Sequence, residues 1–133
     1  MDIETIMEVE GRDPLGNPSE QELSDAIASL NGSDPSYCII QDQNGSFVQF
    51  LGCADSLTVE WHICGEDAEE HYIIGRDDDD ESSVVITHSQ GETEVFKSES
   101  LTAAAAQPIG HAFRSDADLP EGFVVRDVSD LFG

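Results

Sequence analysis

Short runs of β-forming residues, separated by turn residues, fill the sequence from Ser36 to Ser98 and restrict the fold more than any other feature. Connections this short leave no room for the crossovers of a parallel sheet, so the runs predict antiparallel strands. Asn44-Gly45 predicts a hairpin turn of type I′, in which both central residues need a positive φ, and Gln90-Gly91 predicts another turn. The six predicted strands are Tyr37–Gln41, Phe47–Leu51, Leu57–Ile63, His71–Ile74, Val84–Thr87 and Thr93–Lys97.

The run Leu57–Ile63 shows that the predicted sheet has one buried and one polar face. Apolar side chains alternate along it with polar or charged ones, which is typical of a strand covered on one side by helices. Trp61 belongs to the apolar set, and we expect it to be mostly buried. The apolar set is Leu57, Val59, Trp61 and Ile63, and the opposite set is Thr58, Glu60 and His62.

The clearest single element is a helix predicted over Ser19–Leu30. Ser19 and Glu22 have the spacing of a capping box, in which the Ser hydroxyl accepts a backbone N–H and the Glu side chain reaches back. Asn31-Gly32 supplies a left-handed stop. The residues that form the apolar stripe of this helix are Leu23, Ala26, Ile27 and Leu30.

The two ends of the chain complete the predicted fold. Residues 3–9 predict a short strand, and glycines and prolines predict a loop over residues 11–18. Leu101–Phe113 has the composition of a helix, which Pro108 and Gly110 should kink or divide, and Phe123–Arg126 predicts a last strand. We therefore expect a single α+β domain over residues 1–133: an antiparallel sheet of about six strands in a meander, packed on one face by an N-terminal and a C-terminal helix.

The charge of the chain restricts its partners. Twenty-nine acidic residues stand against five basic ones, for a net charge of −24, whereas a small soluble domain commonly carries a charge of about 2–8 in magnitude. Nucleic acids and anionic membranes are poor partners for such a surface, because their non-specific attraction depends on Lys and Arg. A basic protein is a good partner. The alternative is adaptation of the whole surface to a salty cytoplasm, and self-association stays open.

The cysteines and histidines give only a weak indication of a metal site or a catalytic thiol. His62 and Cys64 lie two residues apart on a predicted strand, with Cys53 nearby in sequence, but no paired motif such as C-x₂-C is present. The histidines show no recognisable arrangement, and the sequence has no phosphate-binding glycine loop or hydrolase motif. We therefore expect free thiols in a reducing cytoplasm, no metal or other cofactor, and no enzymatic activity.

Residues 17–126 resemble small bacterial immunity proteins that neutralise polymorphic toxins. The residues that carry this resemblance are Asn17-Pro18-Ser19, Leu30-Asn31-Gly32, Gly45–Gln49, Leu57–Glu60, His71–Ile74, Ala103–Phe113 and Leu119–Gly122. The resemblance implies an α+β fold and a toxin-blocking role without identifying the toxin.

The acidic chemistry agrees with that role, because nuclease and deaminase toxins need basic surfaces for nucleic acid, which an acidic protein can occlude. The densest acidic stretch flanks the predicted strand His71–Ile74, and its loops are the expected contact surface. The residues expected to bind the basic partner are Glu66, Asp67, Glu69, Glu70, Asp77, Asp78, Asp79, Asp80 and Glu81.

Overall fold

A computed structural model describes residues 4–32, 35–65, 69–77, 82–89, 91–115, 117 and 119–128. Over these residues the elements follow one another along the chain as nine strands, two α-helices and one 3₁₀ turn. Their bounds are β1 (Thr5–Val9), β2 (Leu15–Gly16), α1 (Glu20–Ala28), β3 (Tyr37–Asp42), β4 (Phe47–Cys53), β5 (Ser56–Cys64), β6 (Glu69–Arg76), β7 (Ser83–His88), β8 (Gly91–Phe96), η1 (Lys97–Glu99), α2 (Ala103–Arg114) and β9 (Phe123–Asp127).

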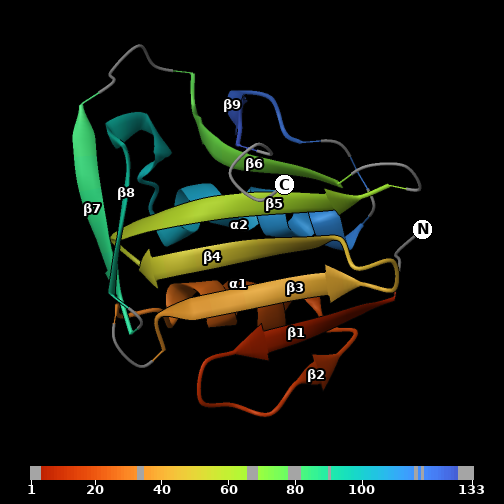
Figure 1. Ribbon diagram of the computed structural model, residues 1–133. Helices are drawn as coiled ribbons and strands as arrows, with labels where there is room; N and C mark the ends of the chain where they lie inside the picture. The colour runs from red at the N-terminus through yellow and green to blue at the C-terminus, as the bar shows by residue number, and fades with distance from the viewer. Residues whose placement is uncertain are drawn as a thin grey trace.

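Seven of the strands form one antiparallel sheet in the order β2-β1-β3-β4-β5-β6-β9, and β7 and β8 form a separate hairpin. Both α-helices lie against the same face of the large sheet (Figure 1). The α+β class and the two helices on one face are therefore as predicted. Neither helix in the described part of the chain is long and apolar enough to span a bilayer.

The helix-covered face of the sheet carries the main core. Strand pairing aligns one buried row across five strands, and the row is Val9, Cys38, Phe50, Val59 and Ile74. These side chains pack against α1 through Leu23 and Ile27 and against α2 through Ala106 and Ile109. Trp61 lies on this face as expected. It is half-buried and meets the Phe113 ring edge-on, with the ring centroids 5.8 Å apart.

Local sequence signals account for the start of α1. Ser19 Oγ accepts the backbone N–H of Glu22 at 3.1 Å, and the Glu22 carboxylate accepts the backbone N–H of Ser19 at 2.9 Å. The capping box is therefore confirmed, and Gly32 has the left-handed φ of 85° expected after the helix. All four residues of the predicted apolar stripe are buried: Leu23, Ala26, Ile27 and Leu30.

Pro108 and Gly110 were expected to kink or divide the second helix, and the division is wrong, because α2 runs without interruption from Ala103 to Arg114. Pro108 lies on the exposed side, while Ala106, Ile109 and Phe113 are buried. Burial of that face stabilises the helix despite the amide that proline lacks. Thr102 caps its start, accepting from the backbone N–H of Ala105.

The predicted six-stranded meander is wrong in one respect, because its last two strands leave the sheet. β9 occupies the edge of β6 that β7 would have needed, with Ile73 opposite Arg126. The hairpin β7-β8 instead packs on β4 and β5, and its Ile86 and Val95 are buried outside the main core. Gly52 permits this contact, since a Cβ there would lie 2.6 Å from Ile86 Cγ2.

Two further details of the strands differ from expectation. Among the described residues only Asn17 and six glycines have a positive φ, so Asn44-Gly45 is not a type I′ turn. Instead the Asp42 carboxylate accepts the backbone N–H groups of Asn44 and Ser46 and organises a four-residue connection. The two-residue strand β2 lies within the predicted loop 11–18 and pairs with β1.

Candidate functional site

The face of the sheet opposite the helices, here called the second face, carries the polar groups of the fold. Strand pairing aligns one row of its side chains across six strands, and the row is Glu8, Ile39, Gln49, Glu60, Ile73 and Arg126. The hairpin β7-β8 covers only one end of this face (Figure 1). Away from the hairpin, ionisable side chains occupy positions on this face that no helix covers.

Most of the predicted partner-binding residues fall outside the described part of the chain: Glu66, Asp67, Asp78, Asp79, Asp80 and Glu81. Of the remaining three, Glu69 and Glu70 begin β6 and Asp77 directly follows its end. All three are exposed. β6 is longer than the predicted His71–Ile74, because its pairing with β5 extends to Cys64 and Glu69. The two ends of β6, where these exposed residues lie, are about 23 Å apart, at roughly 3.3 Å per residue.

A second group of ionisable residues meets across β5 and β6, and we call it the histidine cluster. Pairing places His62 opposite His71 and Cys64 opposite Glu69. Alternation along β5 adds Glu60, which lies on the same face as His62 and Cys64. The cluster is Glu60, His62, Cys64, Glu69 and His71.

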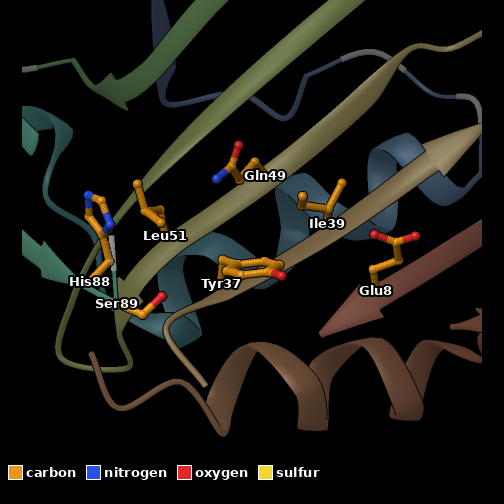
Figure 2. A pocket seen from close by; sticks show the side chains of 7 residues that line it. All are labelled: Glu8, Tyr37, Ile39, Gln49, Leu51, His88 and Ser89. Atoms are coloured by element: carbon orange, nitrogen blue, oxygen red, sulfur yellow. The ribbon is translucent and has the colours of Figure 1, made fainter. Parts of the chain in front are cut away.

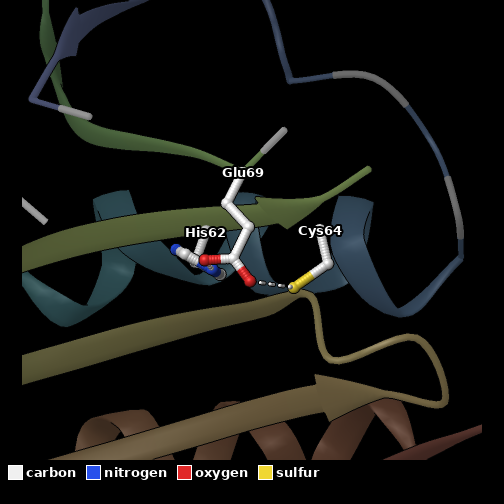
Figure 3. Close-up of side chains that lie close together, drawn as sticks. All are labelled: His62, Cys64 and Glu69. Carbon is white, nitrogen blue, oxygen red and sulfur yellow. Dashed lines mark hydrogen bonds and ion pairs between the residues drawn. The ribbon is translucent and has the colours of Figure 1, made fainter. Parts of the chain in front are cut away.

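The histidine cluster is joined by a continuous series of contacts. His71 Nε2 lies 3.2 Å from Glu60 Oε1, and the two histidine Nδ1 atoms are 3.0 Å apart. His62 Nε2 lies 3.6 Å from Glu69 Oε2. Cys64 Sγ lies 3.8 Å from Glu69 Oε1, the contact drawn in Figure 3. One end of the series is buried and the other reaches solvent, since the exposed side-chain fraction is 6% for His71 and 68% for Glu69.

Neighbouring side chains hold this cluster in place. The Phe47 ring stacks on His62, with centroids 5.0 Å apart and an interplanar angle of 17°. Ser46 Oγ accepts the backbone N–H of Cys64 at 2.9 Å. His62 and His71 are therefore held by packing and hydrogen bonds, whereas the Glu69 side chain is largely exposed.

Two of the three thiols, those of Cys38 and Cys64, are poorly suited to nucleophilic chemistry. Burial raises the pKa of Cys38 to about 12. Desolvation and the nearby Glu69 carboxylate raise the pKa of Cys64 above its ordinary value. A catalytic thiolate needs the opposite shift, toward a lower pKa. All three cysteines are free.

The structure separates the metal ligands that sequence reasoning had grouped. Cys53 pairs with Ser56 at the opposite end of β5 and does not approach His62 or Cys64. Glu69 takes its place, and His62, Cys64 and Glu69 present donor atoms within 4.8 Å of one another. The sequence did contain a signal for this arrangement. In an antiparallel hairpin, the residue numbers of each directly paired couple add up to the same value. That value is 133 both for Cys64 with Glu69 and for His62 with His71.

A shallow hollow of about 250 Å³ lies elsewhere on the second face, beside the β7-β8 hairpin. Figure 2 shows its side chains on the side of the sheet away from the helices. It combines one carboxylate, one imidazole and one phenol with apolar groups, without a hydrogen bond among those three. The lining residues are Glu8, Tyr37, Ile39, Gln49, Leu51, His88 and Ser89.

The carboxylates are mostly left facing solvent. Within the described ranges, Arg126 with Glu99 is the one pair between an arginine or lysine and a carboxylate, at 2.8 Å. Arg12 contacts a serine hydroxyl, and Arg76 donates to a backbone carbonyl. Most of the negative charge of the described residues therefore lies at the surface and is not neutralised by ion pairs with arginine or lysine.

No protein-family model matches the chain, and no curated protein or solved structure is significantly similar to it. The resemblance to immunity proteins therefore stays a prediction, and the function must be argued from surface chemistry.

Proposed function

We propose that this protein is an immunity-type inhibitor that binds a basic toxin domain, of nuclease or deaminase type, and occludes its nucleic-acid surface. The observation that supports the proposal is the surplus of carboxylates at the surface of a folded domain. Within the described residues the one carboxylate paired with an arginine is the buried Glu99, against a net charge of −24 for the chain. Such a surface attracts basic proteins over long range and repels nucleic acids.

Inhibition by occlusion requires no chemistry from the inhibitor. The raised pKa of Cys64 disfavours a thiolate nucleophile. Complementary charge accelerates encounter and gives an association rate that falls with salt. The acidic residues around β6 are the proposed contact, of which Glu70 and Asp77 are exposed. The resemblance of residues 17–126 to immunity proteins favours the same role.

The alternative, a domain whose acidity serves hydration in high salt, is supported by how widely the charge is spread. Exposed carboxylates occur on β1, on α1 and on the β7-β8 hairpin as well as around β6. A surface adapted to salt needs carboxylates on all sides, whereas a binding surface needs them on one. If the acidity is an adaptation to salt, the protein would have a structural or regulatory binding role.

The test uses the C-terminal domain of a toxin encoded beside this gene as the probe. We expect tight binding whose association rate falls steeply with salt. Reversing Glu70 and Asp77 to Lys should slow association about tenfold and flatten the salt dependence, because rim charges act mainly on association. The matched control reverses Glu92 and Glu94, which changes the net charge equally on strand β8, outside the proposed contact.

Two outcomes contradict the proposal. Equal slowing by both double variants would mean that net charge alone acts and that the β6 surface is not the contact. Absence of binding, with stability that rises steeply as salt is added, would support the salt-adapted alternative. Circular dichroism of each variant checks that the fold is retained.

A further inference from the structure

We propose that His62, Cys64 and Glu69 form a Zn²⁺ site, through the Nε2, Sγ and carboxylate atoms respectively, with a fourth position left for water. The three residues come from the facing ends of β5 and β6 (Figure 3). This inference rests on the geometry of the histidine cluster and not on the toxin-binding proposal, although Glu69 belongs to both proposed sites.

The distances suit one tetrahedral ion. Zinc bonds of about 2.0 Å to nitrogen or oxygen and about 2.3 Å to sulfur place neighbouring ligand atoms roughly 3.3–3.6 Å apart. His62 Nε2 and Glu69 Oε2 are 3.6 Å apart, and Cys64 Sγ and Glu69 Oε1 are 3.8 Å apart. All three donors lie within 4.8 Å of one another. The two contacts use different oxygens of Glu69, so an ion bound by all three residues requires one carboxylate oxygen to turn toward both His62 and Cys64, and the 68% exposure of Glu69 leaves room for this.

Hydrogen bonding determines which nitrogen of His62 is available to the ion. A carboxylate only accepts hydrogen bonds, so Nε2 of His71 donates to Glu60. In a neutral His71 the Nδ1 atom must then accept, and it does so from Nδ1–H of His62. This leaves a lone pair on His62 Nε2, which is the form that binds metals.

In this tautomer the contact between His62 Nε2 and the Glu69 carboxylate is unfavourable unless a proton or a metal ion lies between them. The lone pair of His62 Nε2 and the Glu69 carboxylate are both acceptors, and they face one another at 3.6 Å. A metal ion between them satisfies both. The series from Glu60 through His71 to His62 also matches the outer-shell support that metal-binding histidines usually have, in which the second ring nitrogen donates to a fixed acceptor.

The donor set identifies the class of ion. Calcium and magnesium require oxygen ligands, whereas imidazole together with thiolate is typical of zinc. Three protein ligands with one open position is a common zinc arrangement. Carboxylates nearby, including Asp42, which acts electrostatically on Cys64, further favour a cation.

Zn²⁺ binding to the full-length, metal-free protein tests the proposal, measured by calorimetry in excess Mg²⁺ to suppress non-specific binding to surface carboxylates. We expect one ion per chain. Co²⁺ should give a thiolate charge-transfer band that Cys64→Ser abolishes. Cys64→Ser and Glu69→Gln should each weaken Zn²⁺ binding by more than about 100-fold, and Glu60→Gln by about tenfold, the lower range for a residue that orients a ligand.

Two variants serve as matched controls. Cys53→Ser removes a thiol at the other end of β5, and Glu70→Gln removes the carboxylate next to Glu69. Neither should change Zn²⁺ affinity. Because Glu69 is exposed, Glu69→Gln tests the site without disturbing the core.

Weak binding at several sites, equal in the Cys53→Ser and Cys64→Ser proteins, would overturn the proposal. The same conclusion would follow if Co²⁺ gave no thiolate band. The contact between His62 and Glu69 would then be an ion pair with a protonated imidazole, and the histidine cluster would be a structural network.

Discussion

The two faces of the large sheet are built from the same strands, yet they differ in chemistry. The helix-covered face is closed and apolar, and its central residues Phe50, Val59 and Ile74 are fully buried. The second face is only partly covered, and it buries polar groups such as His71 and Glu99. Burial of apolar side chains stabilises the helix-covered face and needs no directional contacts. The polar groups buried on the second face, by contrast, need specific hydrogen-bond partners, which fix their positions.

The sharpest test of this contrast compares Phe50→Ala with Ile86→Ala. Phe50 is fully buried between the sheet and both helices, so its loss should lower the free energy of unfolding by about 3–5 kcal/mol. Ile86→Ala should cost about 2 kcal/mol, at the low end for this substitution, because the hairpin rests on one side of the sheet only. Denaturant unfolding measures both.

Hydrogen exchange decides whether the two faces are also separate in their dynamics. Ile86→Ala should accelerate exchange of β7 and β8 amides while those of β4 and β5 stay protected, whereas Phe50→Ala should accelerate all of them. Equal acceleration throughout the sheet by Ile86→Ala would show that the hairpin belongs to the same cooperative unit as the core.

An effect smaller than that of Phe50→Ala is expected from loss of the ion pair on the second face. Arg126 donates two hydrogen bonds of 2.8 Å to Glu99, and its guanidinium lies 4.7 Å from the centre of the Phe96 ring. These hydrogen bonds raise the pKa of Arg126 above its ordinary value. Arg126→Met leaves the buried Glu99 unpaired.

The expected loss is about 2–3 kcal/mol, below the 3–5 kcal/mol of a fully buried pair because Arg126 is 38% exposed. Thermal unfolding of Arg126→Met beside Arg126→Lys measures it, and the lysine variant should recover part of the loss. No change in either protein would show that the ion pair contributes little to the stability of the fold.

The smallest effect concerns Glu10, which ties β1 to the hairpin. Hydrogen bonds from Ser89 and Ser36 lower the pKa of Glu10 below its ordinary value of 4.5. A lowered folded-state pKa means that these bonds stabilise the fold above the ordinary pKa, and that the stabilisation is lost as pH falls through the folded-state pKa. Glu10→Gln should therefore remove part of the acid sensitivity.

Stability of the wild-type and Glu10→Gln proteins, followed from neutral to acidic pH, isolates this contribution from that of the other carboxylates. The two curves should differ at neutral pH and converge in acid. Parallel curves would show that Ser36 and Ser89 hold the hairpin equally well without the charge.

Much of the fold could be predicted because its signals are local. The capping box at Ser19 and Glu22 and the stripe on α1 depend only on spacing along one helix. A period of two places Leu57, Val59 and Trp61 of β5 on the helix-covered face, although Ile63 is exposed and Thr58 of the opposite set is buried. The continuity of α2 through Pro108 could not be predicted in this way, because it depends on what the helix packs against.

The sequence by itself determined where most of the strands lie, which side of β5 faces the helices and how strongly negative the chain is. Only the tertiary structure decided that β9 takes the edge of β6, that the β7-β8 hairpin lies on the second face, and that Glu69 meets Cys64. The physical reason is that alternation fixes the face of a residue but not its neighbour on the next strand. That neighbour depends on register and on competition between strands for one edge.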